Sequence, residues 1–158
     1  MQNGKNKTGT DREMSISRLV NAPGELVWQA WTAPEHIKHW WGPTGFTNTI
    51  SKMDVKPGGE WEFIMHGPDG TDDKNKHIYK EVNRPERLVL EHVTAPRFLM
   101  TVTFEAVGDK TLVSIHSLFE SAGQLQEVIK VFKADVGMTQ NADRMENYVV
   151  NLNKEPSL

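Results

Sequence analysis

Histidines are the residues of this sequence that best suit acid–base chemistry, because their unperturbed pKa of about 6.5 lies close to neutrality. A histidine that faces an apolar interior has a shifted pKa and can take part in proton transfer. His66, His92 and His116 fall in three strand-like stretches. Alternation places His66 on the face opposite its apolar neighbours, so we expect it to face outward. His92 and His116 stay open as inward-facing candidates.

Other residue types give weaker indications of catalytic or metal-binding chemistry. Tyr79 and Tyr148 are candidates for orienting a bound polar group, and the strand glutamates are most simply partners of lysine and arginine on solvated sheet faces. His36 and His39 are spaced i, i+3 on one predicted helix, but no carboxylate lies at ligand spacing on that face, so we predict no metal site. No Ser-His-Asp order, phosphate-binding glycine loop or dinucleotide fingerprint occurs. The sequence therefore predicts no catalytic residue and no cofactor.

Composition limits the class of protein. The 158 residues fit one domain, which would bury roughly 70% of the surface of its unfolded chain. A net charge of -3, without a block of like charges, argues against a nucleic-acid partner. The absence of cysteine excludes a disulfide framework and fits a reducing compartment. Because there is neither a ~20-residue apolar span nor a signal-peptide core, we expect a cytoplasmic protein without a membrane partner.

The N-terminal third predicts a tail, a strand and two short helices. Residues 1–13 hold almost no large apolar side chain, so we expect a disordered tail before a single domain over residues 14–153. Residues 14–21 alternate imperfectly and predict the first strand. A helix follows a proline in its first turn. Thr32 and Glu35 then match a capping box, with Thr32 as the predicted N-cap of a second short helix.

Two adjacent tryptophans end this second helix, in the His-Trp-Trp-Gly-Pro segment of residues 39–43. Trp40 and Trp41 each carry roughly 150–250 Å² of mostly apolar surface. Aromatic residues at helical spacing usually pack, so the simpler interpretation is that they anchor the helices to the core. A gate over a bound ligand is the alternative. In either case we expect at least one indole to be buried.

After the tryptophans the periodicity changes from helical to alternating. Charged residues 72–76 are interpreted as a hairpin tip, and Ser121 with Gln124 forms a second capping box before a helical pattern that breaks near Gly137. The predicted strands are residues 47–55, 60–66, 77–82, 88–93, 98–106 and 111–119. A strand, two short helices, about six strands and a terminal helix form an α+β layout.

Several short motifs occur in a characteristic order. They are Asn21-Ala-Pro, Val27-Trp-x-Ala-Trp-Thr-x-Pro-Glu35, Trp40-Trp41-Gly42-Pro43, Pro57-Gly58-Gly59, Gly67-Pro68-Asp69-Gly70, Pro85-Glu86-Arg87-Leu88, and Gly137-Met138 through Asp143-Arg144-Met145. In this order the chain resembles the SRPBCC proteins of the START and Bet v type, specifically those similar to the C-terminal domain of the activator of heat-shock protein 90 ATPase. The likeness covers roughly residues 14–152.

The resemblance implies a helix-grip fold. In this fold a curved antiparallel β-sheet wraps around a long C-terminal helix, two short helices after the first strand close one end, and a hydrophobic cavity lies between sheet and helix. Met145 and Tyr148 depart from the residues usual in the family, which implies a cavity that is unusually adaptable or partly filled. The activators resembled have an additional N-terminal domain that this sequence lacks, so chaperone activation is not expected to carry over.

Ten residues are candidates for the ligand-binding wall of that cavity. They are Trp41, Trp61, Phe63, Met65, Tyr79, His92, Met100, Phe104, Met145 and Tyr148. In sequence, a plain hydrophobic core would look the same. We therefore keep both interpretations, and the methionines favour an irregular apolar space because thioether side chains repack easily.

Three functions stay open at this point. The first is a small binding protein that holds a hydrophobic small molecule between the sheet and the C-terminal helix, without chemistry of its own. The second is an enzyme of the polyketide cyclase or aromatase kind, in which an inward histidine or tyrosine acts as acid or base. The third is a co-chaperone-like protein-interaction module. A homodimer would fit any of the three, and the sequence does not identify the ligand.

Overall fold

A computed structural model describes residues 10–154, so the first nine residues of the expected tail lie outside it. A short 3₁₀ helix, η2, spans Thr10–Arg12. The strands are β1 (Glu13–Val20), β2 (Thr47–Met53), β3 (Glu60–His66), β4 (Asp72–Asn83), β5 (Arg87–His92), β6 (Phe98–Val107) and β7 (Lys110–Phe119). The helices are α1 (Gly24–Thr32), α2 (Pro34–Ile37), α3 (Ala122–Phe132) and α4 (Ala134–Lys154).

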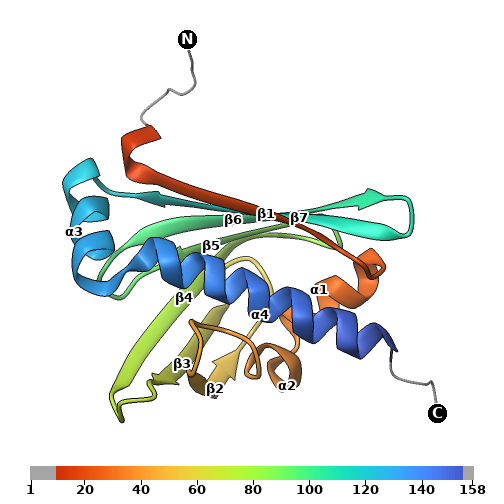
Figure 1. Cartoon of the computed structure of the whole chain (residues 1–158), viewed down its shortest axis with the longest axis horizontal. Helices are drawn as coiled ribbons and strands as arrows, with labels where there is room; N and C mark the ends of the chain where they lie inside the picture. Colours follow the sequence, from red (N-terminus) through yellow and green to blue (C-terminus); the bar gives the residue numbers. More distant parts are fainter. Residues whose placement is uncertain (1–9, 155–158) are drawn as a thin grey trace.

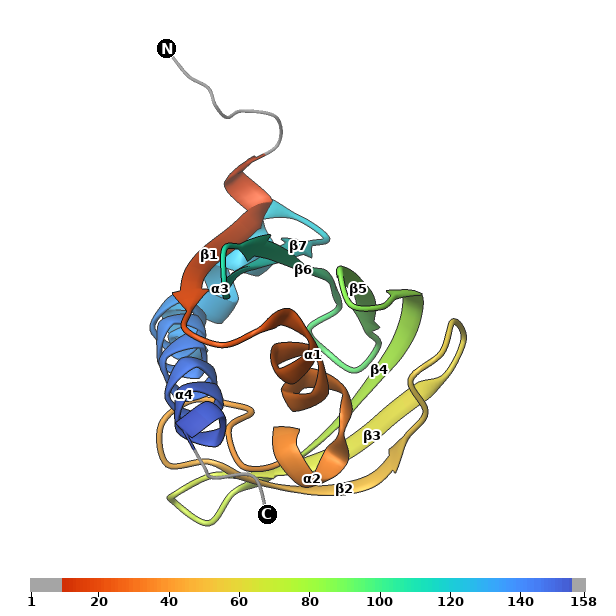
Figure 2. The ribbon, with the colours of Figure 1, turned by 90° about the vertical axis from the view of Figure 1, so that its right-hand side faces the viewer.

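The strands form one seven-stranded antiparallel sheet in the order β1-β7-β6-β5-β4-β3-β2. Figure 1 shows α4 lying along the sheet, and Figure 2 shows the sheet curving from β1 round to β2 with α4 on its open side. Register shifts between Ile50 and Lys52 and between Tyr79 and Glu81 mark irregularities that bend such strands. The predicted α+β helix-grip arrangement is confirmed.

The inner face of the sheet follows directly from strand alternation. In β6, Met100, Val102 and Phe104 are buried, and their register partners in β7 are Ser117, Ile115 and Val113, which are also buried. Successive side chains of a strand point to opposite faces, so the residues between them lie on the outer face. The core therefore lies inside the curve of the sheet, where α1, α2 and α4 cover it.

The two short helices are fastened by tryptophans. The Trp40 indole nitrogen donates a hydrogen bond to the Ala30 carbonyl at 3.1 Å, and the Trp31 and Trp40 rings meet edge to face with centroids 4.8 Å apart. Both rings are almost fully buried. Gly42 ends the segment with a φ of 97°, in the left-handed region that favours glycine, and a Cβ there would lie 2.8 Å from the Met65 methyl group. The expectation that at least one of the adjacent indoles is buried is confirmed.

Helix α4 crosses the sheet on one apolar stripe. Ala142, Met145 and Val149 are buried at helical spacing. On the exposed side, Asp143 and Glu146 pair with Arg18 of β1. No helix within residues 10–154 is long and apolar enough to cross a membrane.

Arg144 ties α4 to the segment that follows α2. Its two terminal nitrogens lie within hydrogen-bond distance of five backbone carbonyls, those of His39, Trp41, Gly42, Pro43 and Phe46, at 2.7–3.3 Å. We call this arrangement the carbonyl clamp. Two further side chains from the preceding turn of α4 bind the same segment: Asn141 accepts from the Gly42 N–H at 3.0 Å and Gln140 accepts from the Thr44 N–H at 3.2 Å. One turn and a half of helix therefore holds residues 39–46 by their backbone.

The structure extends the ordered chain to before residue 14. Residues 10–13, expected in the disordered tail, form η2 and the first residue of β1. The Arg12 guanidinium donates to the Phe119 carbonyl at 3.3 Å, and the Glu13 carboxylate pairs with His116. These polar contacts with β7 attach a segment whose apolar content alone predicts disorder.

Two local predictions are wrong. Thr32 is not an N-cap: its hydroxyl donates to the Trp28 carbonyl at 2.8 Å, and the N-cap of α2 is Ala33, whose side chain makes no capping bond. Residues 72–76 are not a hairpin tip but the start of β4, because pairing with β3 continues to the His66–Asp72 pair. Lys76 and Lys52 both contact the Glu60 carboxylate, which balances charge across these exposed strands.

The last helical region divides earlier than predicted. The break lies at Lys133, whose φ of 54° and ψ of 48° place it in the left-handed region, and not at Gly137, which lies inside α4. The N-cap prediction at Ser121 is confirmed, since its hydroxyl accepts from the Gln124 N–H at 3.0 Å. The Gln124 side chain, however, accepts from the Glu120 N–H at 3.1 Å and does not complete a capping box with Ser121.

We predict that Arg144→Met destabilises the fold by about 2–3 kcal/mol, because it removes a charged donor from several partly buried carbonyls while keeping the aliphatic stem. The stability of Arg144→Lys should lie between those of the wild type and Arg144→Met, since one ammonium group cannot reach all the carbonyls that the planar guanidinium reaches. Urea denaturation measures the free energy of unfolding.

The matched control is Arg18→Met, which removes a surface arginine that also contacts α4. Exposed ion pairs contribute about 1 kcal/mol or less, so this variant should lose little stability. Equal losses in Arg144→Met and Arg18→Met would contradict the special role of the carbonyl clamp.

Candidate functional site

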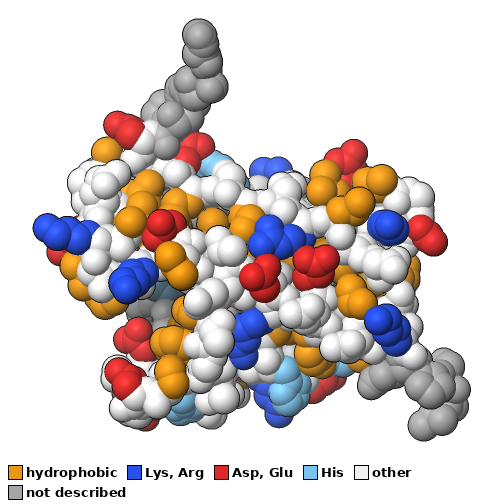
Figure 3. All heavy atoms as spheres, viewed as in Figure 1, with side chains coloured by type: hydrophobic (Ala, Val, Ile, Leu, Met, Phe, Trp, Pro, Cys, Tyr) orange, Lys and Arg blue, Asp and Glu red, His pale blue; other side chains and the backbone are white. Residues whose placement is uncertain are grey.

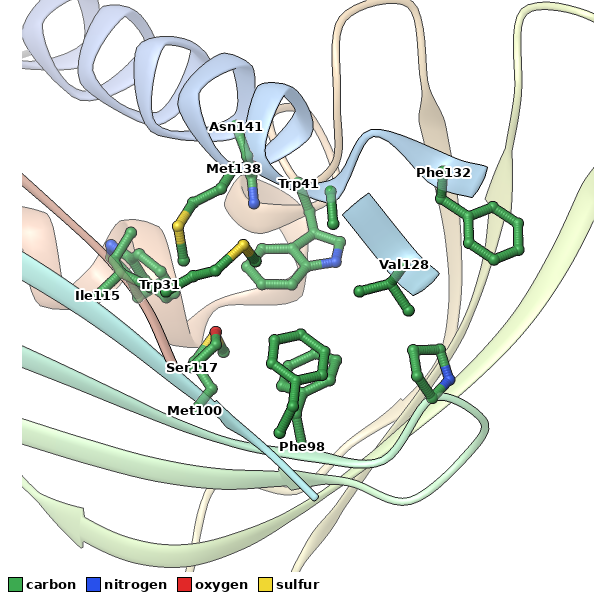
Figure 4. Close-up of a pocket in the computed structure, with 14 residues that line it drawn as sticks. Trp31, Trp41, Phe98, Met100, Ile115, Ser117, Val128, Phe132, Met138 and Asn141 are labelled. Carbon is green, nitrogen blue, oxygen red and sulfur yellow. The ribbon is translucent and has the colours of Figure 1, made fainter. Parts of the chain in front are cut away.

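A cavity of about 240 Å³ lies between the inner face of the sheet and the helices. The sheet contributes Phe98, Met100, Ile115 and Ser117, from the β6 and β7 positions whose alternation points them inward. The helical side contributes Trp31 and Trp41, together with Val128, Phe132, Met138 and Asn141 of the α3–α4 region. Figure 4 shows these side chains around the cavity, with the Trp41 ring at its centre and α4 above it.

The cavity wall is almost entirely apolar and carries no charge. Among its lining residues, all within the described part of the chain, none is Asp, Glu, Lys, Arg or His. The hydrogen-bonding groups on the wall are the Ser117 hydroxyl, the Asn141 amide and the indole N–H of Trp41, whereas the Trp31 indole nitrogen is buried. Such a wall suits an apolar molecule that is oriented by a few polar contacts.

The cavity opens at the end of the molecule where α3 meets α4. A second, outer hollow of about 750 Å³ shares Pro96, Val128 and Phe132 with it, so the two adjoin at this point. Phe132 is 72% exposed, and Val131 and Val136 beside it are exposed as well. In Figure 3, hydrophobic side chains lie over the end of the molecule that α3 occupies in Figure 1. We call this end, with Pro96 and Phe132 on either side, the mouth.

The α3–α4 junction forms this mouth because α3 is held by its own small core. Phe119, Leu125 and Val128 pack together there, apart from the main core. Lys133, in its left-handed conformation, then turns the chain into α4. Phe132 is the last residue of α3 and lies directly before this turn, which explains why so large a ring stays exposed.

A buried histidine pair lies behind the cavity wall. His77 of β4 is 1% exposed; its ring stacks on Trp61 with centroids 4.8 Å apart and meets the His92 ring edge to face at 5.0 Å. Neither ring nitrogen of His77 has a hydrogen-bond partner among the described residues. His92, in contrast, contacts the Pro96 carbonyl and the Asn75 side chain, both at 2.7 Å.

Burial controls the protonation of both rings. It lowers the pKa of His77 well below the ordinary value of 6.5, and the nearby His92 lowers it further. Burial also lowers the pKa of His92, although its contacts with the Pro96 and Thr94 backbone act in the opposite direction. Both histidines are therefore neutral at pH 7. Burial likewise raises the pKa of the Tyr79 hydroxyl, so this group stays protonated.

The structure places the ten predicted ligand-binding residues at five different locations. Trp41 and Met100 line the inner cavity, and Met65 lines the outer hollow. Trp61, Phe63, Tyr79, Phe104 and Met145 are buried in the main core. His92 lies behind the wall, and Tyr148 of α4 is half-buried against the main core, where its hydroxyl is 2.7 Å from the His36 ring and its own ring stacks on His39. A ligand role for these residues stays a prediction.

The other predicted histidines face away from the cavity. His66 contacts Asp72 and Thr49 on the outer face, in agreement with its strand parity. His116 pairs with Glu13, also on the outer face. Within residues 10–154, no group of three or more metal-binding side chains occurs, and His36 and His39 contact Tyr148 instead.

Sequence reasoning missed several residues of the site. His77 begins a predicted strand, and its alternation with Tyr79 was a signal that it faces the same way as that residue. Ser117 alternates with Val113 and Ile115 in the same manner. Asn141 and Phe132 carried no comparable signal, because their roles depend on where α4 and the α3–α4 turn lie against the sheet.

Comparison with known proteins supports the fold. A model of the family described as activator of Hsp90 ATPase homolog 1-like protein matches residues 21–150. The chain is similar to a solution structure from Arthrobacter aurescens, with a TM-score of 0.85 and 24% identity over 92% of this chain and 90% of the other. The chain is also similar to a crystal structure from Nitrosomonas europaea, with a TM-score of 0.81 and 21% identity over 92% of this chain and 98% of the other.

An AHSA1-like protein from Aeromonas hydrophila gives a TM-score of 0.72 and 22% identity over 92% of this chain and 97% of the other. These structural likenesses, all below 25% identity, show a shared fold. A search among curated proteins found no match.

We predict that the buried His77 makes stability depend on pH. Below pH 6.5 the unfolded chain binds a proton at this residue that the folded chain does not bind, so stability is full above the unfolded pKa and falls as pH falls below it. One such group contributes up to about 1.4 kcal/mol per pH unit. His77→Phe keeps a stacked ring and removes the titration, so urea denaturation between pH 7 and pH 5 should give a smaller loss than in the wild type.

His39→Gln is the control, because His39 is exposed and its removal leaves the buried pair intact. This variant should lose as much stability between pH 7 and pH 5 as the wild type does. If His77→Phe lost as much stability on acidification as the wild type, protonation of His77 would not be the cause.

Proposed function

The chain belongs to the family of activator of Hsp90 ATPase homolog 1-like proteins, and from this premise we propose that it binds a hydrophobic small molecule in the cavity between the sheet and α4. The observation that carries the proposal is an uncharged, largely apolar cavity of about 240 Å³ next to a wider outer hollow. If these side chains formed only a hydrophobic core, they would pack against one another and leave no open space. Here Trp41, Met100 and Met138 border open space instead.

The mouth supports the proposal because it gives such a molecule a way in. Exposed apolar side chains are costly in water when they cluster, and such patches usually mark binding surfaces or ligand grooves. Phe132 takes part in both hollows, and Val136 lines the outer one. Asp73, Glu127 and Lys133 also line the outer hollow, but the residues that it shares with the inner cavity, Pro96, Val128 and Phe132, are apolar.

Acid–base catalysis receives no such support. The inward candidates His92 and Tyr79 are buried but do not line the inner cavity, and His116 lies on the outer face. Among the described residues, therefore, no titratable side chain faces the inner cavity. The chaperone-related alternative stays a prediction, because the outer face of the sheet shows no feature that favours it.

The first test uses the neutral dye N-phenyl-1-naphthylamine, whose fluorescence rises in an apolar site. We expect saturable binding to the wild type at one dye per chain. Ala134 lines the cavity at the start of α4, so Ala134→Phe should fill part of the cavity and weaken dye binding at least tenfold. Fluorescence titration measures both dissociation constants.

Thr139→Phe is the matched control, because it adds the same ring at an exposed position of the same helix. It should leave dye binding unchanged. Absence of saturable binding to the wild type, or equal weakening by both variants, would contradict binding in the cavity. Native mass spectrometry of the protein from its source would show directly whether a molecule is retained.

A further inference from the structure

We infer that the ligand is an uncharged molecule that carries a carbonyl or similar acceptor, and that this acceptor takes a hydrogen bond from the Asn141 side-chain amide. This inference rests on the proposed function, since it specifies the ligand of the same cavity. Three observations carry it: the fixed orientation of the Asn141 amide, the excess of donors on the wall, and the absence of charge.

The orientation of Asn141 is fixed by its backbone partner. The Gly42 N–H donates to Asn141 Oδ1 at 3.0 Å, and an N–H group can donate only to an acceptor, so the oxygen must lie on that side. The amide nitrogen then lies on the other side, and Figure 4 shows it directed toward the cavity. Within residues 10–154 the only hydrogen bond of this side chain is the one to Gly42.

This orientation is held firmly, because Gly42 belongs to the segment that Arg144 grips. The Arg144 guanidinium lies 2.9 Å from the Gly42 carbonyl, while Asn141 binds the N–H of the same residue. A flipped amide would place its NH₂ group against the Gly42 N–H and lose the bond. The structure therefore presents two amide hydrogens of Asn141, and not its oxygen, on the cavity side.

Donors outnumber acceptors on the wall. The indole N–H of Trp41 can only donate, and in Figure 4 its nitrogen points along the cavity toward Val128. The Ser117 hydroxyl, on the opposite sheet wall, can both donate and accept. A ligand that brings an acceptor therefore satisfies these groups better than one that brings only donors.

Charge is excluded by the same wall. Neither an acid nor a base lines the inner cavity in the part of the chain that the structure describes. A carboxylate or an ammonium would lose its water there without gaining an ion pair, which is strongly unfavourable. A carbonyl loses less on desolvation and regains a hydrogen bond from Asn141.

The volume sets the size of the ligand body. A cavity of about 150 Å³ accepts benzene, so about 240 Å³ corresponds to two fused rings of roughly ten non-hydrogen atoms. Larger ligands would extend through the mouth into the outer hollow, past Phe132.

The test compares 1-tetralone with tetralin, which share two fused rings and differ by the carbonyl group. Both are titrated against bound N-phenyl-1-naphthylamine, and the ratio of their affinities is the readout. Asn141→Asp keeps an oxygen for the Gly42 N–H and replaces the cavity-facing NH₂ by oxygen, so the fold is retained. We expect the tetralone-to-tetralin affinity ratio to fall about tenfold in this variant.

A matched variant isolates the role of Asn141. Gln140→Glu makes the same amide-to-carboxylate change one residue earlier and keeps the acceptor for the Thr44 N–H, so the ratio should stay at the wild-type value. A ratio that falls in Gln140→Glu as much as in Asn141→Asp would overturn the assignment.

The outcomes separate the inference from the proposed function. If the wild type binds the dye and both bicyclic probes, but Asn141→Asp leaves the affinity ratio unchanged, the inference is wrong and the cavity still binds ligands. If neither the dye nor either probe binds the wild type, the proposed function and the inference are both wrong.

Discussion

The grip of Arg144 on backbone carbonyls is the interaction on which the rest of the structure depends. The guanidinium joins α4, which comes last in the chain, to the segment between α2 and β2, about a hundred residues earlier. Carbonyl oxygens receive it, and no carboxylate among residues 10–154 pairs with it, so burial lowers the pKa of Arg144. The cost of burying the charge is offset by several hydrogen bonds, which the planar guanidinium with its five N–H donors can make and a lysine ammonium cannot.

The same attachment positions one wall of the cavity. Trp41 lies in the segment that Arg144 holds, and its ring borders the inner cavity together with that of Trp31. Further along α4, three side chains pack into the main core: Ala142, Met145 and Val149. The open space therefore lies beside the first part of α4, where Met138 and Asn141 line it.

Periodicity predicted most of the fold, because the strands alternate and the helices carry clear stripes. The strand ends and helix breaks were harder, since β4 continues through a charged stretch by pairing with β3, and the last helical region breaks at Lys133 through its backbone conformation. The residues of the candidate site were harder to predict than the fold. Trp41 and Met100 could be recognised as apolar and inward, but Tyr148 contacts His36 and His39 and does not line the cavity, and Asn141 depends on a contact with Gly42 that no local pattern records.

The carbonyl clamp and its two neighbouring bonds contact only backbone atoms of residues 39–46. Side chains of that segment, among them Pro43, Thr44 and Phe46, border the outer hollow. The bonds that fix the backbone of this segment are thus independent of the side chains that it presents to the outer hollow. A substitution at Thr44 or Phe46 would therefore change the side chains that border the outer hollow and leave in place the bonds that hold the backbone there.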